Sequence, residues 1–239
     1  MRERAYAHIQ ARIARHELRA GMPVSELALA KELGSSRTPI REAISQLVSD
    51  GLLEQIPNRG AVVVQLTRQD VIDLYELREA LEVFAAGKAA RRTIQPADLQ
   101  HLREIADQTR VLRDALLKSG REFLKPDEMH RFINSDLGFH TLLMRLAANA
   151  RILRVVNETR LMIRVFSMRR RGHNAAELQR ILNDHHAIVN ALARGQAERA
   201  ARILTEHIRL SEQESLDEFD ARAREDALND HLHDFSFEG

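Results

Sequence analysis

The architecture of the N-terminal part follows from residues 25–63, which read SELALAKELGSSRTPIREAISQLVSDGLLEQIPNRGAVV. Residues 25–33 have the pattern of a short helix, Gly34 suits a tight turn, and Ser36 is placed to cap a second helix. The runs LLEQI and AVVVQ then flank Pro57–Gly60, a pattern typical of two strands joined by a tight turn. Together these elements predict a winged helix-turn-helix.

The flanking residues extend this prediction in both directions. Upstream, residues 4–17 place Ala5, Ile9 and Ile13 at helical spacing, which predicts a first helix. Downstream, Thr67 and Asp70 are spaced as a capping box and indicate the start of another helix. We therefore expect a DNA-binding domain at residues 1–66.

The second helix of the motif carries polar and cationic side chains at its N-terminal end, where a recognition helix reaches bases and phosphates. Arginines four residues apart share one helix face and can bind guanine or phosphate, and a glycine in the wing allows close approach to DNA. An ordinary solvated helix face is the alternative. The predicted DNA-binding residues are Ser36, Arg37, Thr38, Arg41, Arg59 and Gly60.

The remainder of the chain is helical in pattern. Residues 67–222 carry apolar residues at three-to-four spacing, which predicts an antiparallel bundle of six or seven helices, so the fold class is mainly α. The predicted breaks are Thr93–Pro96, Ser119–Gly120, Lys125–Pro126, Asn149, Gly172–Asn174 and Gly195. Residues 223–239 complete a strongly acidic end that we expect to be disordered.

Four residues of the helical part have the spacing of a metal site. Asp136 and His140 are four apart on one predicted helix and share a face. His185 and His207 lie symmetrically about Gln196, which belongs to the predicted break at Arg194–Gln196, so a helical hairpin would place them at one level. Three imidazoles and one carboxylate suit a divalent transition metal, zinc first, or nickel, manganese or iron. Because the chain has eleven histidines, a chance pair remains an alternative.

The composition excludes several classes of protein. The net charge is +1, and no apolar run approaches the roughly 20 residues of a membrane helix, so we expect a soluble cytoplasmic protein without membrane partners. Without cysteine, neither disulfides nor thiolate metal sites can form. Only 4% of residues are aromatic, which disfavours recognition of single strands by base stacking.

These motifs identify a family resemblance that covers roughly residues 5–215. The run SRTPIREAI is similar to the SRTPVREAL hallmark of GntR-family transcription regulators, and LYELREALE, DLGFH, DHHAIVNAL and ILTEHI follow the order of the helical effector (FCD) domain of the FadR-like subgroup. The resemblance implies a homodimeric repressor or activator, with a repressor preferred, that binds a palindromic double-stranded DNA operator. It also implies a divalent metal held by Asp136, His140, His185 and His207 that helps to bind a small organic acid.

Two further positions gain meaning from the resemblance. Arg78 matches a position that can meet an effector carboxylate, although an intrahelical pair with Glu82 explains it equally well. Leu27 replaces an arginine that related proteins often use in the first helix of the motif. Apart from the resemblance, Arg160 falls in a basic stretch that could form a second DNA surface, but that we interpret as a charged helix face answered by acids elsewhere.

Two other functions compete with this interpretation. A metal-dependent enzyme would use the open metal positions to activate water, but the sequence has no His-Glu-x-x-His motif and no evident general base, so we expect no enzyme activity. An architectural DNA-binding dimer would use the helical part only for dimerisation, and its histidines would be incidental.

Overall fold

The computed structural model describes residues 1–14, 17–166 and 172–234. The chain divides into two compact units, one containing Met1–Asp70 and the other containing Val71–Arg160 with the described C-terminal helices, while the last residues of the helix that ends at Phe166 group with the first unit. The sequence expectation placed the boundary after residue 66. None of the described helices is long and apolar enough to cross a membrane.

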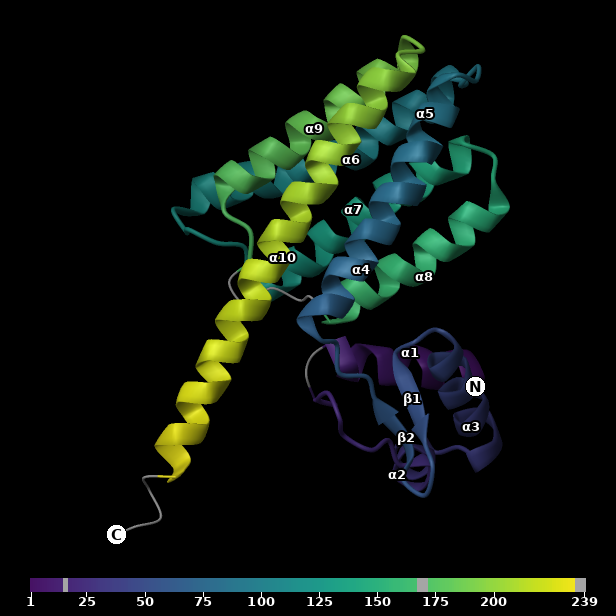
Figure 1. Cartoon of the computed structure of the whole chain (residues 1–239), viewed down its shortest axis with the longest axis vertical. Helices are drawn as coiled ribbons and strands as arrows, with labels where there is room; N and C mark the ends of the chain where they lie inside the picture. The colour runs from purple at the N-terminus through teal and green to yellow at the C-terminus, as the bar shows by residue number, and fades with distance from the viewer. Residues whose placement is uncertain (15–16, 167–171, 235–239) are drawn as a thin grey trace. The chain divides into compact units, whose positions relative to one another are not determined.

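The first unit is a winged helix-turn-helix, as predicted (Figure 1). Helix α3 packs against both α1 and α2 and against the first strand, and buried aliphatic side chains fill the space between them. The two strands pair antiparallel, with Leu53 opposite Val63. The elements are α1 (Arg2–Ala14), α2 (Glu26–Glu32), α3 (Arg37–Ser49), β1 (Leu53–Ile56) and β2 (Gly60–Val63).

Turn chemistry explains where these elements begin and end. The Ser25 hydroxyl accepts a hydrogen bond from the backbone N–H of Ala28 and caps α2, and Gly34 adopts a φ of 59° in the turn before α3. Ser36 occupies the N-cap position of α3 as predicted, but its side chain makes no capping hydrogen bond, so the expected cap is absent. The predicted capping box is present, because Thr67 and Asp70 bond reciprocally.

The second unit is the helical bundle. The first three of its elements are continuous and form one long helix. The described residues of this unit therefore form six helices, the lower of the two numbers predicted from the sequence. The observed breaks between helices coincide with the predicted ones. The elements are α4 (Arg68–Arg78), the π-helical segment η1 (Glu79–Val83), α5 (Phe84–Ala90), α6 (Pro96–Ser119), α7 (Pro126–Leu146), α8 (Ala150–Phe166), α9 (Ala175–Ala193) and α10 (Ala197–Asp234).

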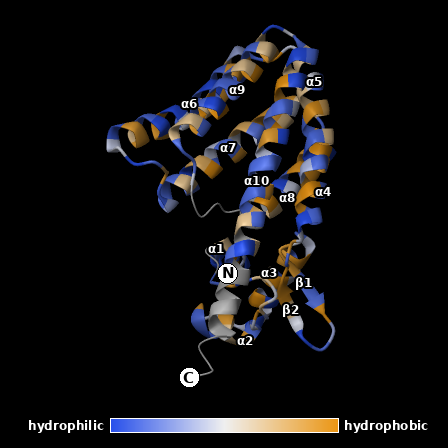
Figure 2. Ribbon diagram, turned by 60° about the vertical axis from the view of Figure 1, so that its left-hand side comes forward, coloured by the Kyte–Doolittle hydropathy of each residue, from blue (hydrophilic) through white to orange (hydrophobic). Residues whose placement is uncertain are grey.

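Packing in this unit centres on α9, which contacts α6 on one side and α10 on the other (Figure 1). Helix α5 contacts α7, α9 and α10 and closes the bundle. Figure 2 shows both hydrophilic and hydrophobic residues along these helices, as expected for amphipathic helices that bury one face. Segment η1 contacts α10, and its Glu82 lies against His140 of α7.

The C-terminal end differs from the sequence prediction. A disordered tail was expected from residue 223, but α10 continues as a helix to Asp234. Before the predicted tail, Gln213 Nε2 donates to Asp217 Oδ1 one turn along the same helix, at 2.9 Å. The last part of the predicted tail, residues 235–239, lies outside the described residues.

Candidate metal centre

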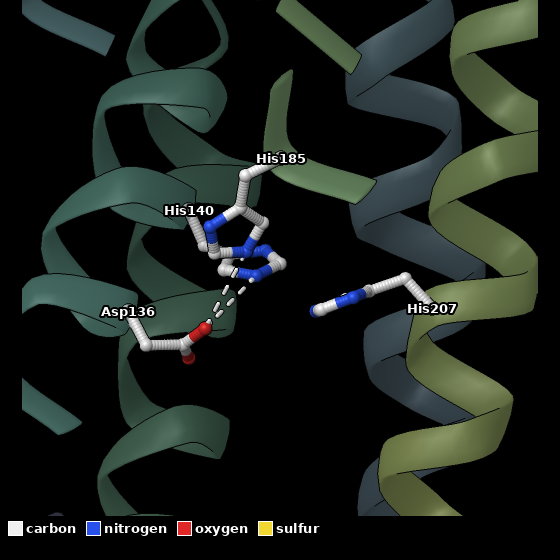
Figure 3. Close-up of side chains that lie close together, drawn as sticks. All are labelled: Asp136, His140, His185 and His207. Carbon is white, nitrogen blue, oxygen red and sulfur yellow. Dashed lines mark ion pairs between the residues drawn. The ribbon is translucent and has the colours of Figure 1, made fainter. Parts of the chain in front are cut away.

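Three helices bring the four predicted ligands together (Figure 3). Asp136 and His140 come from α7, His185 from α9 and His207 from α10, and one donor atom of each lies within 4.8 Å of the others. The imidazole centroids of His185 and His207 are 5.1 Å apart, which matches the symmetry of these residues about Gln196. The spacing argument thus correctly predicted the convergence of the side chains.

The cluster is buried and incompletely hydrogen-bonded. His140, His185 and His207 are 0%, 1% and 3% exposed. The Nε2 of His140 and both ring nitrogens of His185 have no hydrogen-bond partner among the described residues. Leaving a buried polar atom without a partner costs about 1–3 kcal/mol. A cation bound in the cluster would give a partner to Nε2 of His140 and to one ring nitrogen of His185. The residues therefore fit a metal ion.

The protonation states also suit metal binding. Burial and the nearby Arg160 guanidinium lower the pKa of His140 to about 4, although two carboxylates oppose this shift. Burial and the neighbouring His207 likewise hold the pKa of His185 well below its ordinary value. Burial alone would raise the pKa of Asp136, but the surrounding histidines and Arg160 outweigh it and lower the pKa. At neutral pH these shifts leave His140 and His185 neutral and Asp136 ionised.

Each ligand side chain has a neighbour that fixes its orientation. Glu82 Oε2 lies 2.7 Å from His140 Nδ1, and Asp184 Oδ2 lies 3.2 Å from His207 Nδ1. Arg160 donates to Asp136 Oδ2 at 3.3 Å, while Asp136 Oδ1 faces His140 and His185 at 3.7 and 3.6 Å. The His185 ring stacks on Phe139, with centroids 3.9 Å apart and planes at 9°. The ligand geometry is thus held by contacts outside the cluster.

Two buried arginines lie beside the cluster. Arg78 is 4% exposed and its Nε donates to Glu82 at 2.9 Å, so the intrahelical pair considered for this residue is present. Arg160 is 5% exposed and contacts Glu82 and Asp136, so acids elsewhere in the chain do pair with it, as expected, but they do so in the interior of the bundle. The guanidiniums of Arg78 and Arg160 and the carboxylates of Glu82 and Asp136 together carry no net charge.

Sequence reasoning missed Glu82 and Arg160 as site residues. Arg160 follows Ile152 and Val156 at four-residue intervals, so it lies on the buried stripe of α8. An arginine at such a position is a usable signal, because charged side chains are rarely buried without a partner. Glu82 carries a weaker signal, since its bond to His140 joins residues 58 positions apart.

The predicted DNA-binding residues are all exposed in the first unit. The side chains of Arg37 and Arg41 are 60% and 63% exposed, and both donate to Glu26, at distances of 3.1 and 3.1–3.2 Å. Gly60 has a φ of 80°, which glycine adopts without strain, and Arg59 precedes it at the tip of the wing. The arginines at the start of α3 are therefore partly neutralised by a carboxylate on α2.

Comparison with known proteins adds independent information. The family model "Bacterial regulatory proteins, gntR family" matches residues 1–63, and the model of the FCD domain matches residues 73–210. The chain is 32% identical over 196 residues to the "Probable D-xylose utilization operon transcriptional repressor" of Paenarthrobacter nicotinovorans, covering 82% of this chain and 80% of that protein. It is 28% identical over 193 residues to the "Gluconate operon transcriptional repressor" of Bacillus licheniformis, covering 79% and 74%.

Solved structures show the same fold. E. coli McbR/YncC superposes with a TM-score of 0.71 at 20% identity, covering 91% of this chain and 98% of that chain. A GntR transcriptional regulator from Rhodococcus sp. RHA1 superposes with a TM-score of 0.63 at 27% identity, covering 90% and 97%.

Proposed function

The chain belongs to the GntR family of bacterial regulatory proteins, and from this premise we propose that it is a transcriptional repressor controlled by a metal-bound organic acid. Members of this family are DNA-binding transcription regulators, so the expectation that the chain is not an enzyme is confirmed. The winged helix-turn-helix would bind the operator, and the FCD domain would bind the effector. Its DNA target would place the protein in the cytoplasm.

The observation that carries the effector proposal is the buried cluster of three histidines and one aspartate with unpartnered nitrogens. Asp136, His140, His185 and His207 would hold a divalent transition metal, with zinc the first candidate because nitrogen and oxygen ligands suit it. The metal would supply Lewis-acid binding of a carboxylate at positions that the four side chains leave open. The metal-dependent enzyme considered above is set aside by the family membership.

Charge balance supports an anionic effector. Arg78 and Arg160 already offset Glu82 and Asp136, so a divalent cation would add two uncompensated positive charges to a buried site. An uncompensated buried charge is strongly unfavourable. A small carboxylate beside the metal would restore the balance, and the guanidinium of Arg78, whose Nε donates to Glu82, is suited to binding it.

Control of DNA binding would require a second copy of the chain. A homodimer presents two copies of α3 to the two halves of a palindromic operator. The effector changes operator affinity only if it binds differently to the DNA-competent and DNA-incompetent dimers. The predicted contacts are Ser36, Arg37, Thr38 and Arg41 on α3, with Arg59 and Gly60 in the wing.

A pair of adjacent histidines provides the test of metal binding. His185 lies in the cluster, whereas the neighbouring His186 turns away and contacts Asp107 at 3.0 Å. We expect about one equivalent of metal per chain in the wild type and in His186→Ala, and loss of most of it in His185→Ala. Equal metal content in the two variants would contradict the assignment.

The effector and the operator are tested on the same protein. A thermal-shift screen of small carboxylic acids, with and without chelator, should give a stabilisation that the chelator abolishes. Selection from random duplexes should recover a palindromic sequence, and the active acid should release it. Absence of both metal and any acid-dependent shift would favour the architectural dimer instead.

A further inference from the structure

Glu82 connects the metal ligands to the buried arginines. Its side chain is 0% exposed, and its two oxygens contact three groups. Oε1 accepts from Arg78 at 2.9 Å and from Arg160 at 3.3 Å, while Oε2 lies 2.7 Å from Nδ1 of His140. This carboxylate is therefore shared by both guanidiniums and one imidazole.

The contacts of Glu82 decide which nitrogen of His140 carries the proton. Two guanidiniums donate to its Oε1, from Arg78 at 2.9 Å and from Arg160 at 3.3 Å, and two such cations favour the carboxylate form. An ionised carboxylate can only accept hydrogen bonds. The hydrogen on His140 is therefore on Nδ1, and Nε2 directs a lone pair toward Asp136 and the other histidines.

We propose that Glu82 is a positioning residue, which fixes the tautomer and orientation of His140 and so prepares the candidate metal centre before an ion arrives. The inference rests on the metal-binding function proposed above. Carboxylates that hold a metal-ligating histidine in this way commonly raise metal affinity about 10–100-fold. Because the same carboxylate balances Arg78 and Arg160, it also links the metal ligands to the residues suited to an anion.

The local backbone supports this role. Glu82 lies in η1, the π-helical segment between α4 and α5, whereas Arg78 lies at the end of α4. Short π-helical segments are rare and often occur at functional sites. This segment also packs against α10, the helix that carries His207.

Glu82→Gln is the most informative variant because it keeps the shape of the side chain. The two guanidiniums donate to the Oε1 position, so they select the amide oxygen there. The amide nitrogen then faces His140 and donates to Nδ1. We expect the proton to move to Nε2, where it points into the cluster and must leave or shift before His140 can bind the metal, which weakens metal binding.

Glu79→Gln is the matched control. Glu79 lies in the same segment, but it pairs with Arg209 on α10 at 2.8 Å and makes no contact with the cluster. Glu82→Asp is the rescue variant, since it retains a carboxylate and should retain the Nδ1–H tautomer. Circular dichroism of each variant checks that the fold is intact.

The experiment combines two measurements on the full chain. Nitrogen-15 NMR of the metal-free protein reports the His140 tautomer, and competition with a chromophoric chelator reports Zn²⁺ affinity. We expect Nδ1–H in the wild type and Nε2–H in Glu82→Gln, with affinity about 10–100-fold weaker in that variant and unchanged in Glu79→Gln. Glu82→Asp should lie between the two.

The possible failures can be told apart. A wild type that binds no Zn²⁺ would remove the proposed metal function and this inference with it. A wild type that binds Zn²⁺ while Glu82→Gln binds equally well would overturn the role of Glu82 alone. Equal losses in Glu82→Gln and Glu82→Asp would indicate a packing effect and would also overturn it. The wild-type spectrum is a test by itself, because an Nε2–H tautomer contradicts the inference.

Discussion

Glu26 on α2 limits the positive charge that α3 can offer to DNA. It accepts hydrogen bonds from both Arg37 and Arg41, at 3.1–3.2 Å, and the bond from Arg41 lowers its pKa, so it is ionised at neutral pH. Glu26→Gln removes this negative charge while keeping the size of the side chain. We expect the variant to bind duplex DNA more tightly than the wild type, most clearly at low salt.

The size of the effect follows from the charges. Arg37 and Arg41 carry two positive charges, and Glu26 reduces the local sum to one. Each additional cation that neutralises a phosphate makes the slope of log K against log salt steeper by about 0.9, so two protomers give about 1.8. Over a fourfold range of salt concentration, a slope change of about 1.8 corresponds to roughly a 12-fold change in relative affinity.

Fluorescence anisotropy of a labelled duplex over a salt series measures this slope. Glu32→Gln is the matched control, since Glu32 lies on the same helix but contacts His8 and Arg12 on α1. The control changes the net charge of the protein by the same amount without releasing the arginines of α3. Equal slopes for the two variants, or weaker binding by Glu26→Gln, would refute the reasoning.

Three further predictions concern single residues. Leu27 is 69% exposed on α2, so Leu27→Arg should strengthen DNA binding. The slope of log K against log salt should become steeper by about 0.9 per protomer. An unchanged slope would place this residue away from the duplex. Leu47 is fully buried in the first unit, so Leu47→Ala should lower the free energy of unfolding by about 2–5 kcal/mol in urea titrations. The hydrogen bonds from Arg121 lower the pKa of Glu128 from an ordinary value of 4.5 to about 2. The stability that this pair contributes is complete above pH 4.5 and is lost as the pH falls toward about 2. The wild type should therefore have the higher free energy of unfolding above this interval and lose that excess over Glu128→Gln across it. A difference in unfolding free energy that stays constant with pH would contradict the pairing.

Local patterns explain why so much of the fold could be predicted. Ala5, Ile9 and Ile13 recur at helical spacing and are all buried, and the PNRG turn sets the wing register that pairs Ile56 with Gly60. The expectation failed where no local signal exists. The residues after 223 are acidic and look disordered in composition, yet α10 continues through them to Asp234.

The candidate site divides in the same way. His140 follows Asp136 by one helical turn, and a helical hairpin relates His185 to His207, so local spacing predicts each pair, while packing of the bundle brings the two pairs together. Glu82 could not be placed from periodicity, because which helix faces α7 is decided by packing between distant segments. The contacts that hold the ligands in place are therefore less predictable than the ligands themselves.

Helix α10 has the geometry of a lever. His207 lies near its beginning, and the 27 residues from there to Asp234 extend about 40 Å at a rise of 1.5 Å per residue. If the helix pivots as a rigid rod, a tilt of about 5° at His207 displaces the other end by about 3.5 Å. A movement at one imidazole too small to break a hydrogen bond thus becomes, at the far end of the same helix, as large as the diameter of an atom.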